Sequence, residues 1–264
     1  MRRAIYILLL WTLLLASCGT FEVTLTTSDA LTQTSASDSP APVPAPLGMD
    51  SSSEQIRQTV LDSPFHWRTI FMDAQVTSVG EAPRRVQAWV DQSALALRVL
   101  SGPPEASAET FRVADGMSLL ELDLRTGKSS LSPFLGETIG LPYTPQPPDL
   151  KPSVGIEPHP LSTAVDPALG TLLFPSDIAQ NDGIFQPIAM EVLAYKLVLV
   201  VEWTYTQNNL PSYRAWVDIS TGIFLRLQQF EKSGGTDVMS EVAVTRVDYN
   251  LAFSPDLFSP VVYA

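Results

Sequence analysis

Alternation of apolar and polar residues constrains the fold of this chain more than any other feature. The clearest run is 195–205, where the odd positions hold Tyr, Leu, Leu, Val, Trp and Tyr and several even positions are polar. Successive side chains of a β-strand point to opposite faces, so this run predicts a strand with one buried and one wetter face. Further strand-like runs cover 68–79, 84–90, 95–100, 109–113, 118–124, 213–218, 223–230 and 240–250.

Short turn signals separate these runs, among them Asp115-Gly116, Thr126-Gly127 and Thr221-Gly222. Asp, Thr and Gly favour tight turns because they tolerate or stabilise turn conformations. Parallel strands need crossovers of about a dozen residues or more, whereas antiparallel neighbours can be joined by a short turn. The sequence therefore predicts a mostly β (α+β) fold built on an antiparallel meander.

Two segments are predicted to be short helices. The segment 51–62 begins with serines that can cap a helix and ends before Pro64, and Asp166-Pro167 provides a cap and a first-turn proline for 167–174. The second helix lies within a Pro-rich stretch at about 131–187, which interrupts the strand pattern. An insertion of this length is usually functional, as a lid or binding loop, or disordered.

A short sequence echo links the two halves of the chain. Ala88-Trp89-Val90-Asp91 recurs as Ala215-Trp216-Val217-Asp218, and a serine follows two residues later in both copies. Both copies are typical of a strand, a tight turn and a second strand. The echo predicts two similar halves of one curved sheet, although hairpins of one sheet can also share simple constraints by chance.

The N-terminus carries an export signal. Arg2 and Arg3 precede an apolar run at 4–15, and the sequence Leu-Ala-Ser-Cys ends at Cys18, the only cysteine. A basic start, a short apolar core and small residues before the cut are typical of a secretory signal. The alternative, an uncleaved membrane anchor, needs about 20 apolar residues, which the run does not reach.

The sequence Leu-Ala-Ser-Cys at the expected cleavage site resembles a bacterial lipobox. That resemblance implies cleavage before Cys18, attachment of lipid to its thiol and acylation of its new amino group with a fatty acid such as palmitate. Residues 1–17 would be the lipoprotein signal peptide, and the Thr-, Ser-, Ala- and Pro-rich residues 18–50 a lipidated, disordered tether. The expected location is the cell membrane, lipid-anchored and facing the extracytoplasmic side.

Charge and cysteine content exclude several classes of partner and site. The formal net charge of −12 argues against nucleic acid and against a broad basic patch for anionic membranes. With Cys18 lipidated, no cysteine remains for a disulfide or a metal site. The histidines, His66 and His159, lack neighbours at metal-ligand spacing and are expected to lie isolated on the surface.

No catalytic motif, cofactor fingerprint or metal site is predicted, so the chain is not expected to be an enzyme. Asp91 and Asp218 fit hairpin corners. Arg98 and Arg226 could bind a phosphate or carboxylate, but such residues more often extend along a sheet face and pair locally. A hydrolase built from polar residues that converge in the fold is the weakest alternative.

The pattern as a whole resembles the LolA/LolB-like bacterial lipoprotein carriers and the periplasmic regulators of the RseB type. The resemblance is carried by the helix at 52–62, the hairpin 85–99, the strand and turn 111–116, the second hairpin 215–226 and the closing segment 250–258. It implies that 51–264 is a curved antiparallel sheet forming an incomplete half-barrel, plugged by short helices. The concave interior of such a half-barrel can hold an acyl chain. The lipid signal on this chain and its Pro-rich insertion depart from the compact, soluble carriers.

Five aromatic residues are candidates to line such a cavity, with ordinary core packing as the alternative. They are Trp89, Trp203, Tyr205, Trp216 and Phe224. The preferred hypothesis is a membrane-anchored lipoprotein with a non-enzymatic half-barrel that binds a lipid or other apolar ligand. The alternative is a sensing or regulatory module that binds a protein partner at the cell envelope.

Overall fold

The computed structural model describes residues 46–134, 139, 141–144, 158–175, 183–205, 212–231 and 235–260. All of them belong to one compact unit, residues 44–264. The predicted signal peptide, nearly all of the predicted tether and Cys18 lie outside the described residues, as does part of the Pro-rich insertion.

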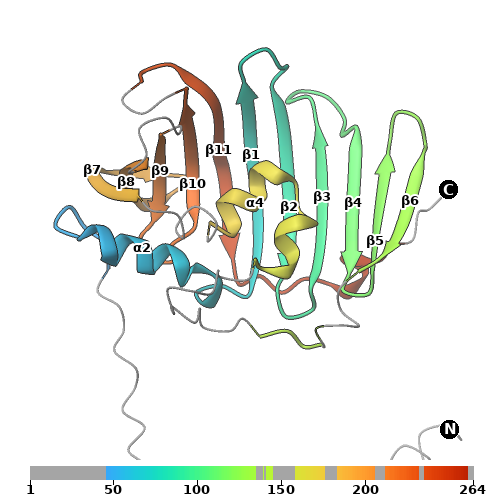
Figure 1. Cartoon of the computed structure of the whole chain (residues 1–264). Helices are drawn as coiled ribbons and strands as arrows, with labels where there is room; N and C mark the ends of the chain where they lie inside the picture. Colours follow the sequence, from blue (N-terminus) through green and yellow to red (C-terminus); the bar gives the residue numbers. More distant parts are fainter. Residues whose placement is uncertain are drawn as a thin grey trace, which may run out of the picture. The chain divides into compact units, whose positions relative to one another are not determined.

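An open antiparallel sheet of eleven strands forms the fold, in the order β6-β5-β4-β3-β2-β1-β11-β10-β9-β8-β7 (Figure 1). The strands are β1 (Thr69–Ser78), β2 (Arg84–Asp91), β3 (Ala96–Gly102), β4 (Thr110–Asp115), β5 (Ser118–Asp123), β6 (Ser129–Pro133), β7 (Gly183–Leu193), β8 (Lys196–Tyr205), β9 (Tyr213–Asp218), β10 (Phe224–Phe230) and β11 (Val238–Tyr249). The sheet curves and does not close, because β6 and β7 remain edges. The predicted fold class, a mostly β half-barrel with short helices, is confirmed.

Each half of the sheet is a meander of sequence neighbours, and the pairing of β1 with β11 joins the halves. The sequence echo forms matching hairpins in the two halves, β2–β3 and β9–β10. In the first, Asp91 Oδ1 accepts hydrogen bonds from the amide and hydroxyl of Ser93, at 3.0 and 2.7 Å. In the second, Asp218 Oδ1 accepts the same pair of bonds from Ser220, at 2.8 and 2.6 Å.

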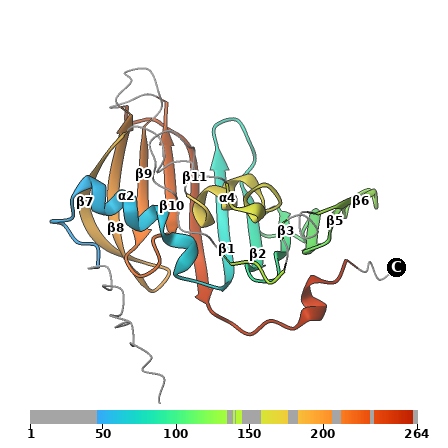
Figure 2. The ribbon, with the colours of Figure 1, turned by 60° about the horizontal axis from the view of Figure 1, so that its bottom comes forward.

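Both predicted helices are present and lie on the same face of the sheet (Figures 1 and 2). Helix α2 (Ser53–Leu61) begins after Ser52, whose hydroxyl accepts a bond from Gln55 N at 3.1 Å. Helix α4 (Pro167–Leu173) begins after Asp166, which accepts from Ala168 N at 3.0 Å. Short 3-10 helices are η1 (Ser63–Phe65), η2 (Pro160–Thr163) and η3 (Pro255–Phe258).

The main core lies between the sheet and these helices. Apolar residues at alternate strand positions, such as Ile70 and Met72 of β1, meet Ile56 of α2 and Leu169 of α4, and all four are fully buried. A smaller cluster lies on the opposite face of β3–β5, where η3 covers it. Its buried members are Ala96, Val113, Leu120 and Phe258.

Two strands were missed in the sequence, β6 and β7, both at the ends of the predicted irregular insertion. β7 contains Pro187, and its register shifts between Pro187 and Ala189, so period-two alternation is lost there. β6 is rich in serine and exposed throughout. Edge strands need no alternating apolar face, and proline is tolerated where no ladder bond is donated.

The prediction that run 195–205 has one buried and one wetter face holds only in part, because the second face is half-exposed at Lys196, Glu202 and Thr204 but buried between them. Tyr195 and Leu197 are exposed, whereas Val198, Leu199, Val200 and Val201 are all buried, on both faces of β8. The second face is covered because Trp216 of β9 lies directly opposite Val200 and packs there.

The prediction that both histidines lie on the surface was wrong for His159, which is buried beneath η2. Its ring stacks on Phe174 at 4.2 Å and meets Tyr143 edge-on at 5.1 Å. His159 Nδ1 accepts a bond from Leu161 N at 3.2 Å, which places the proton of the neutral ring on Nε2. Burial lowers the pKa of His159 to about 3.

We predict that Gly222→Ala destabilises the domain by about 3 kcal/mol in urea unfolding. Gly222 has φ +77°, and a Cβ there would lie 2.2 Å from the carbonyl oxygen of Thr59 in α2. Gly127→Ala is the matched control: φ is +70° with nothing within 4 Å of the added Cβ, so only about 1 kcal/mol of backbone strain is expected. Equal losses in the two variants would contradict the close approach of α2.

We also predict that His159 makes stability fall as the pH falls. The unfolded chain takes up a proton near pH 6.5, whereas the folded chain resists protonation down to about pH 3. Stability therefore falls between these values, by about 2 kcal/mol from pH 7 to pH 5. Chemical unfolding at both pH values should show this loss in the wild type and not in His159→Phe; an equal loss in both would contradict the assignment.

Candidate functional site

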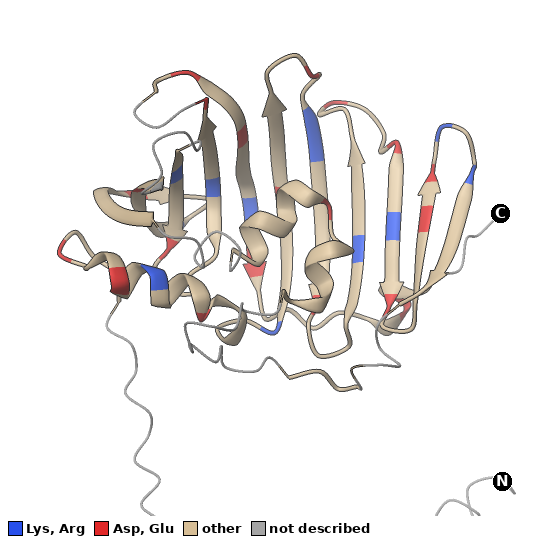
Figure 3. Ribbon diagram, viewed as in Figure 1, with Lys and Arg blue, Asp and Glu red and all other residues tan. Residues whose placement is uncertain are grey.

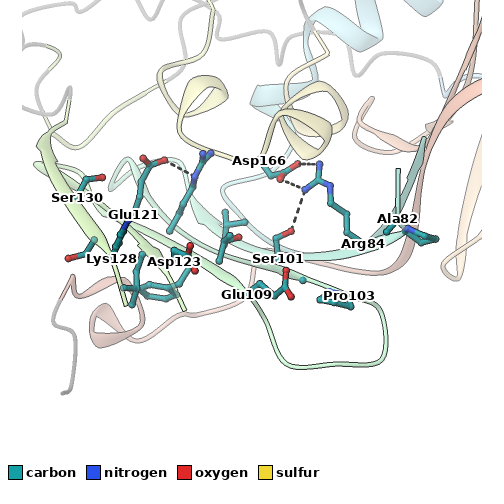
Figure 4. A pocket seen from close by; sticks show the side chains of 18 residues that line it. Ala82, Arg84, Ser101, Pro103, Glu109, Glu121, Asp123, Lys128, Ser130 and Asp166 are labelled. Atoms are coloured by element: carbon teal, nitrogen blue, oxygen red, sulfur yellow. Dashed lines mark hydrogen bonds and ion pairs between the residues drawn. The ribbon is translucent and has the colours of Figure 1, made fainter. Parts of the chain in front are cut away.

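A pocket of about 760 Å³ lies on the helix-bearing face of the sheet, between the start of α4 and edge strand β6 (Figure 4). Its floor is made by β3, β4 and β5, whose side chains at alternate positions point to this face. Among its lining residues are Arg84, Ser101, Thr110, Arg112, Glu121, Asp123, Ser130 and Asp166. The helices cover an apolar part of this face, and the pocket beside them has both charged and apolar lining residues, the latter including Val99, Phe111 and Leu122.

Two ion pairs organise the pocket. Arg84 of β2 holds Asp166 through two bonds of 2.5 and 3.1 Å, and its Nη1 also reaches the Ser101 hydroxyl at 3.3 Å. On the floor, Arg112 Nε lies 2.8 Å from Glu121 Oε1 across the β4–β5 pair. A bidentate Arg–carboxylate pair is both directional and strong. Asp166 therefore fixes the start of α4 and one wall of the pocket at the same time.

The charged residues of the lining suit a ligand that has polar groups of its own. The lining carries side chains of both charges. An apolar chain that covered them would displace the water bound to them and would offer no hydrogen bonds in exchange. A ligand with its own charged and hydrogen-bonding groups can exchange with either ion pair. Residues of these types are common on any protein surface, so no sequence pattern marks the pocket.

Two of the predicted aromatic residues lie in the closed core. Trp203 is fully buried, with its ring stacked on Phe185 at 4.7 Å. Only glycine fits at position 183, because a Cβ there would collide with the Trp203 indole. Phe224 of β10 is buried in the same cluster. Both side chains pack against protein, and neither lines the pocket.

Trp216 and Trp89 lie on the opposite face of the sheet. Trp216 Nε1 donates to Glu191 Oε2 at 2.8 Å, and the Arg226 guanidinium lies 4.6 Å from its ring centre. The Trp89 ring contacts Phe71 at 4.9 Å. Tyr205 ends β8, and its side chain lies outside the described part of the structure. The five predicted residues are therefore not brought together around one site.

Arginines stack on aromatic rings across this second face, one from each of several strands. Figure 3 marks the Lys and Arg positions along the strands in blue. Besides Arg226, the stacked residues are Arg98 over Trp89 and Phe111, Arg214 over Phe230, and Arg246 over Phe71. Three of them also pair with carboxylates: Arg214 with Glu202, Arg226 with Glu241 and Arg246 with Asp248. Cation–π contacts and ion pairs thus cover apolar rings where no helix does.

The carboxylates noted in the sequence serve the fold. Asp218 is buried, and its second oxygen, Oδ2, accepts from the Tyr249 hydroxyl at 2.6 Å. Burial, followed by the nearby charge of Asp218, raises the pKa of Tyr249. Within the described ranges, no three potential metal-ligating side chains converge. No helix in the same ranges is both long and apolar enough to cross a membrane.

Comparison with known proteins gives structural matches only. No protein family matches the sequence, and no curated protein matches it. Among solved structures, the chain is similar to the Pseudomonas aeruginosa MucA/MucB complex (13% identity, TM-score 0.46, covering 78% of this chain and 60% of the other). The chain thus spans about three fifths of that partner-bound protein.

Two further solved structures match a similar share of this chain. One is the Mycobacterium tuberculosis lipoprotein LppX (11% identity, TM-score 0.45, covering 78% of this chain and 100% of the other). The other is a LolA superfamily protein from Nitrosomonas europaea (11% identity, TM-score 0.31, covering 79% of this chain and 98% of the other).

Proposed function

We propose that this chain is an exported lipoprotein, anchored to a membrane through Cys18, whose half-barrel is a non-enzymatic binding module. The observation that carries the proposal is the open pocket beside α4, with its ion pairs Arg84–Asp166 and Arg112–Glu121. Paired charges on the wall and floor of a pocket favour a ligand with charges of both signs. A segment of a protein partner at the cell envelope has that chemistry, and one of the similar structures is itself a complex of two proteins.

A lipid or other apolar ligand is the second candidate. A continuous apolar surface lies behind α2 and α4, formed by residues such as Ile70, Met72 and Ala88. Polar bonds that hold the helices over this surface include Ser53–Phe185 and Asp166–Arg84. Displacement of the helices would expose this surface to an acyl chain.

A photo-cross-linking residue at Ser130, in the pocket, tests the first candidate in living cells. We expect a protein adduct from Ser130 that is lost when Arg112→Glu reverses the charge on the pocket floor. The same residue at Thr77, exposed on the opposite face of β1, is the control and should give no such adduct. Native mass spectrometry of the Cys18→Ser chain provides the other arm. A bound lipid that is lost in Trp203→Ala, together with no protein adduct from Ser130, would overturn the first candidate in favour of the second.

Lipidation is tested separately by the intact mass of the protein purified from bacterial membranes. We expect the mass of residues 18–264 plus that of a diacylglycerol and an acyl chain. Cys18→Ala should carry no lipid mass, because the thiol is lost. Ser17→Ala, which keeps a small residue before the cut, should remain lipidated. An unmodified wild-type mass would contradict the anchor and leave the pocket unaffected.

A further inference from the structure

The outer edge of β7 is blocked over only half of its length. An edge strand presents unpaired N–H and C=O groups that can bind another strand, and proteins usually block them. In the first half of β7, the Phe185 amide donates to Ser53 Oγ of α2 at 3.0 Å, Pro187 has no N–H, and the register shifts between Pro187 and Ala189. In the second half, Ala189–Leu193, the described residues provide no such block.

The hairpin that follows determines which backbone groups face outward. Leu193 pairs with Lys196 across a two-residue turn, so these two residues exchange backbone hydrogen bonds with each other. Bonding direction alternates along an antiparallel strand. Glu191 therefore bonds to β8, whereas the N–H and C=O groups of Met190 and Val192 point away from the sheet.

Exposed apolar side chains accompany these outward groups. Val192 is 72% exposed and lies directly opposite Leu197, which is 45% exposed, on the helix-bearing face. The turn beside them holds Tyr195 at 99% exposure. Ala194 and Tyr195 have φ of +48° and +61°, which costs about 1 kcal/mol or more at each non-glycine residue. Strain that presents a tyrosine wholly to solvent is typical of a contact surface.

Charge selects the partner for this edge. Glu191 lies between Met190 and Val192, on the other face of β7, and is exposed. Two copies of this chain paired symmetrically over this half-strand would place their Glu191 residues opposite one another, and each chain carries a net charge of −12. Like charges on directly opposed residues destabilise a strand pair. A basic residue in that position would instead pair with Glu191.

We propose that the second half of β7 binds an extended segment of a protein partner as an additional strand. The segment carries apolar residues opposite Met190 and Val192 and a Lys or Arg opposite Glu191. Main-chain bonds supply affinity in this mode, and alternate side chains supply specificity. The site is separate from the pocket beside α4 and does not depend on what the pocket binds.

The test uses a fluorescein-labelled peptide, Ser-Thr-Val-Lys-Val-Thr-Ser, and the full chain with Cys18→Ser, read by fluorescence anisotropy. We expect saturable binding that is about fivefold weaker when Glu replaces the central Lys, and equal binding of both peptides to Glu191→Gln. Val192→Pro removes one outward N–H and keeps the bonds to β8, so it should weaken binding about fivefold. Hydrogen exchange should show new protection of the Met190 and Val192 amides.

Two controls keep the outcome decisive. Val192→Lys leaves the backbone unchanged and should also weaken binding, while Arg112→Ala in the pocket should leave it unaltered. Circular dichroism confirms that each variant is folded. Absence of binding up to about 1 mM peptide would overturn the proposal, as would binding that is insensitive to Val192→Pro and Val192→Lys. Self-association through β7, seen in sedimentation and strengthened by Glu191→Gln, would assign the edge to a second copy instead.

Discussion

The pairing of β1 with β11 is the contact on which the rest of the structure depends. Every other strand pair joins strands that are consecutive in the sequence. This ladder instead connects residues that are far apart in the sequence, such as Ile70 and Tyr249. It runs through the middle of the sheet and carries buried residues of both strands, including Met72 and Val244. Without it, the two meanders would be separate curved sheets, and the surface that α2 and α4 cover would be divided between them.

Most of the fold could be predicted because the strands between turns are short and locally patterned. Asp91 and Asp218 shape matching turns through their own side chains, so the hairpins are readable from a few neighbouring residues. The missed strand β7 has its pattern broken by Pro187 and a register shift. Its assignment depends on β8, which pairs with it, and on Ser53 of α2, which contacts its outer edge. β8 follows β7 directly, but Ser53 lies about 130 residues away in the sequence, so local sequence does not contain it.

The candidate site was harder to predict, because the sequence does not say which face of each strand meets the helices. Trp216 and Trp203 are aromatic residues of the neighbouring strands β9 and β8, yet they lie on opposite faces of the sheet. A shift of one residue in register moves a side chain to the other face, and register shifts occur in β10 as well as β7. The pocket residues Arg112 and Glu121 become recognisable as a pair only once β4 and β5 are aligned.

The position of β11 has a consequence for how such a chain can be made and moved. The last of the described strands, Val238–Tyr249, lies in the middle of the sheet, so β1 has only one neighbour until β11 is available. A chain that is threaded through a membrane from its N-terminus would emerge with the inner edge of β1 unpaired and the surface beneath the helices short of Val244 and Val247. Completion of the sheet is thereby tied to the arrival of β11 on the far side.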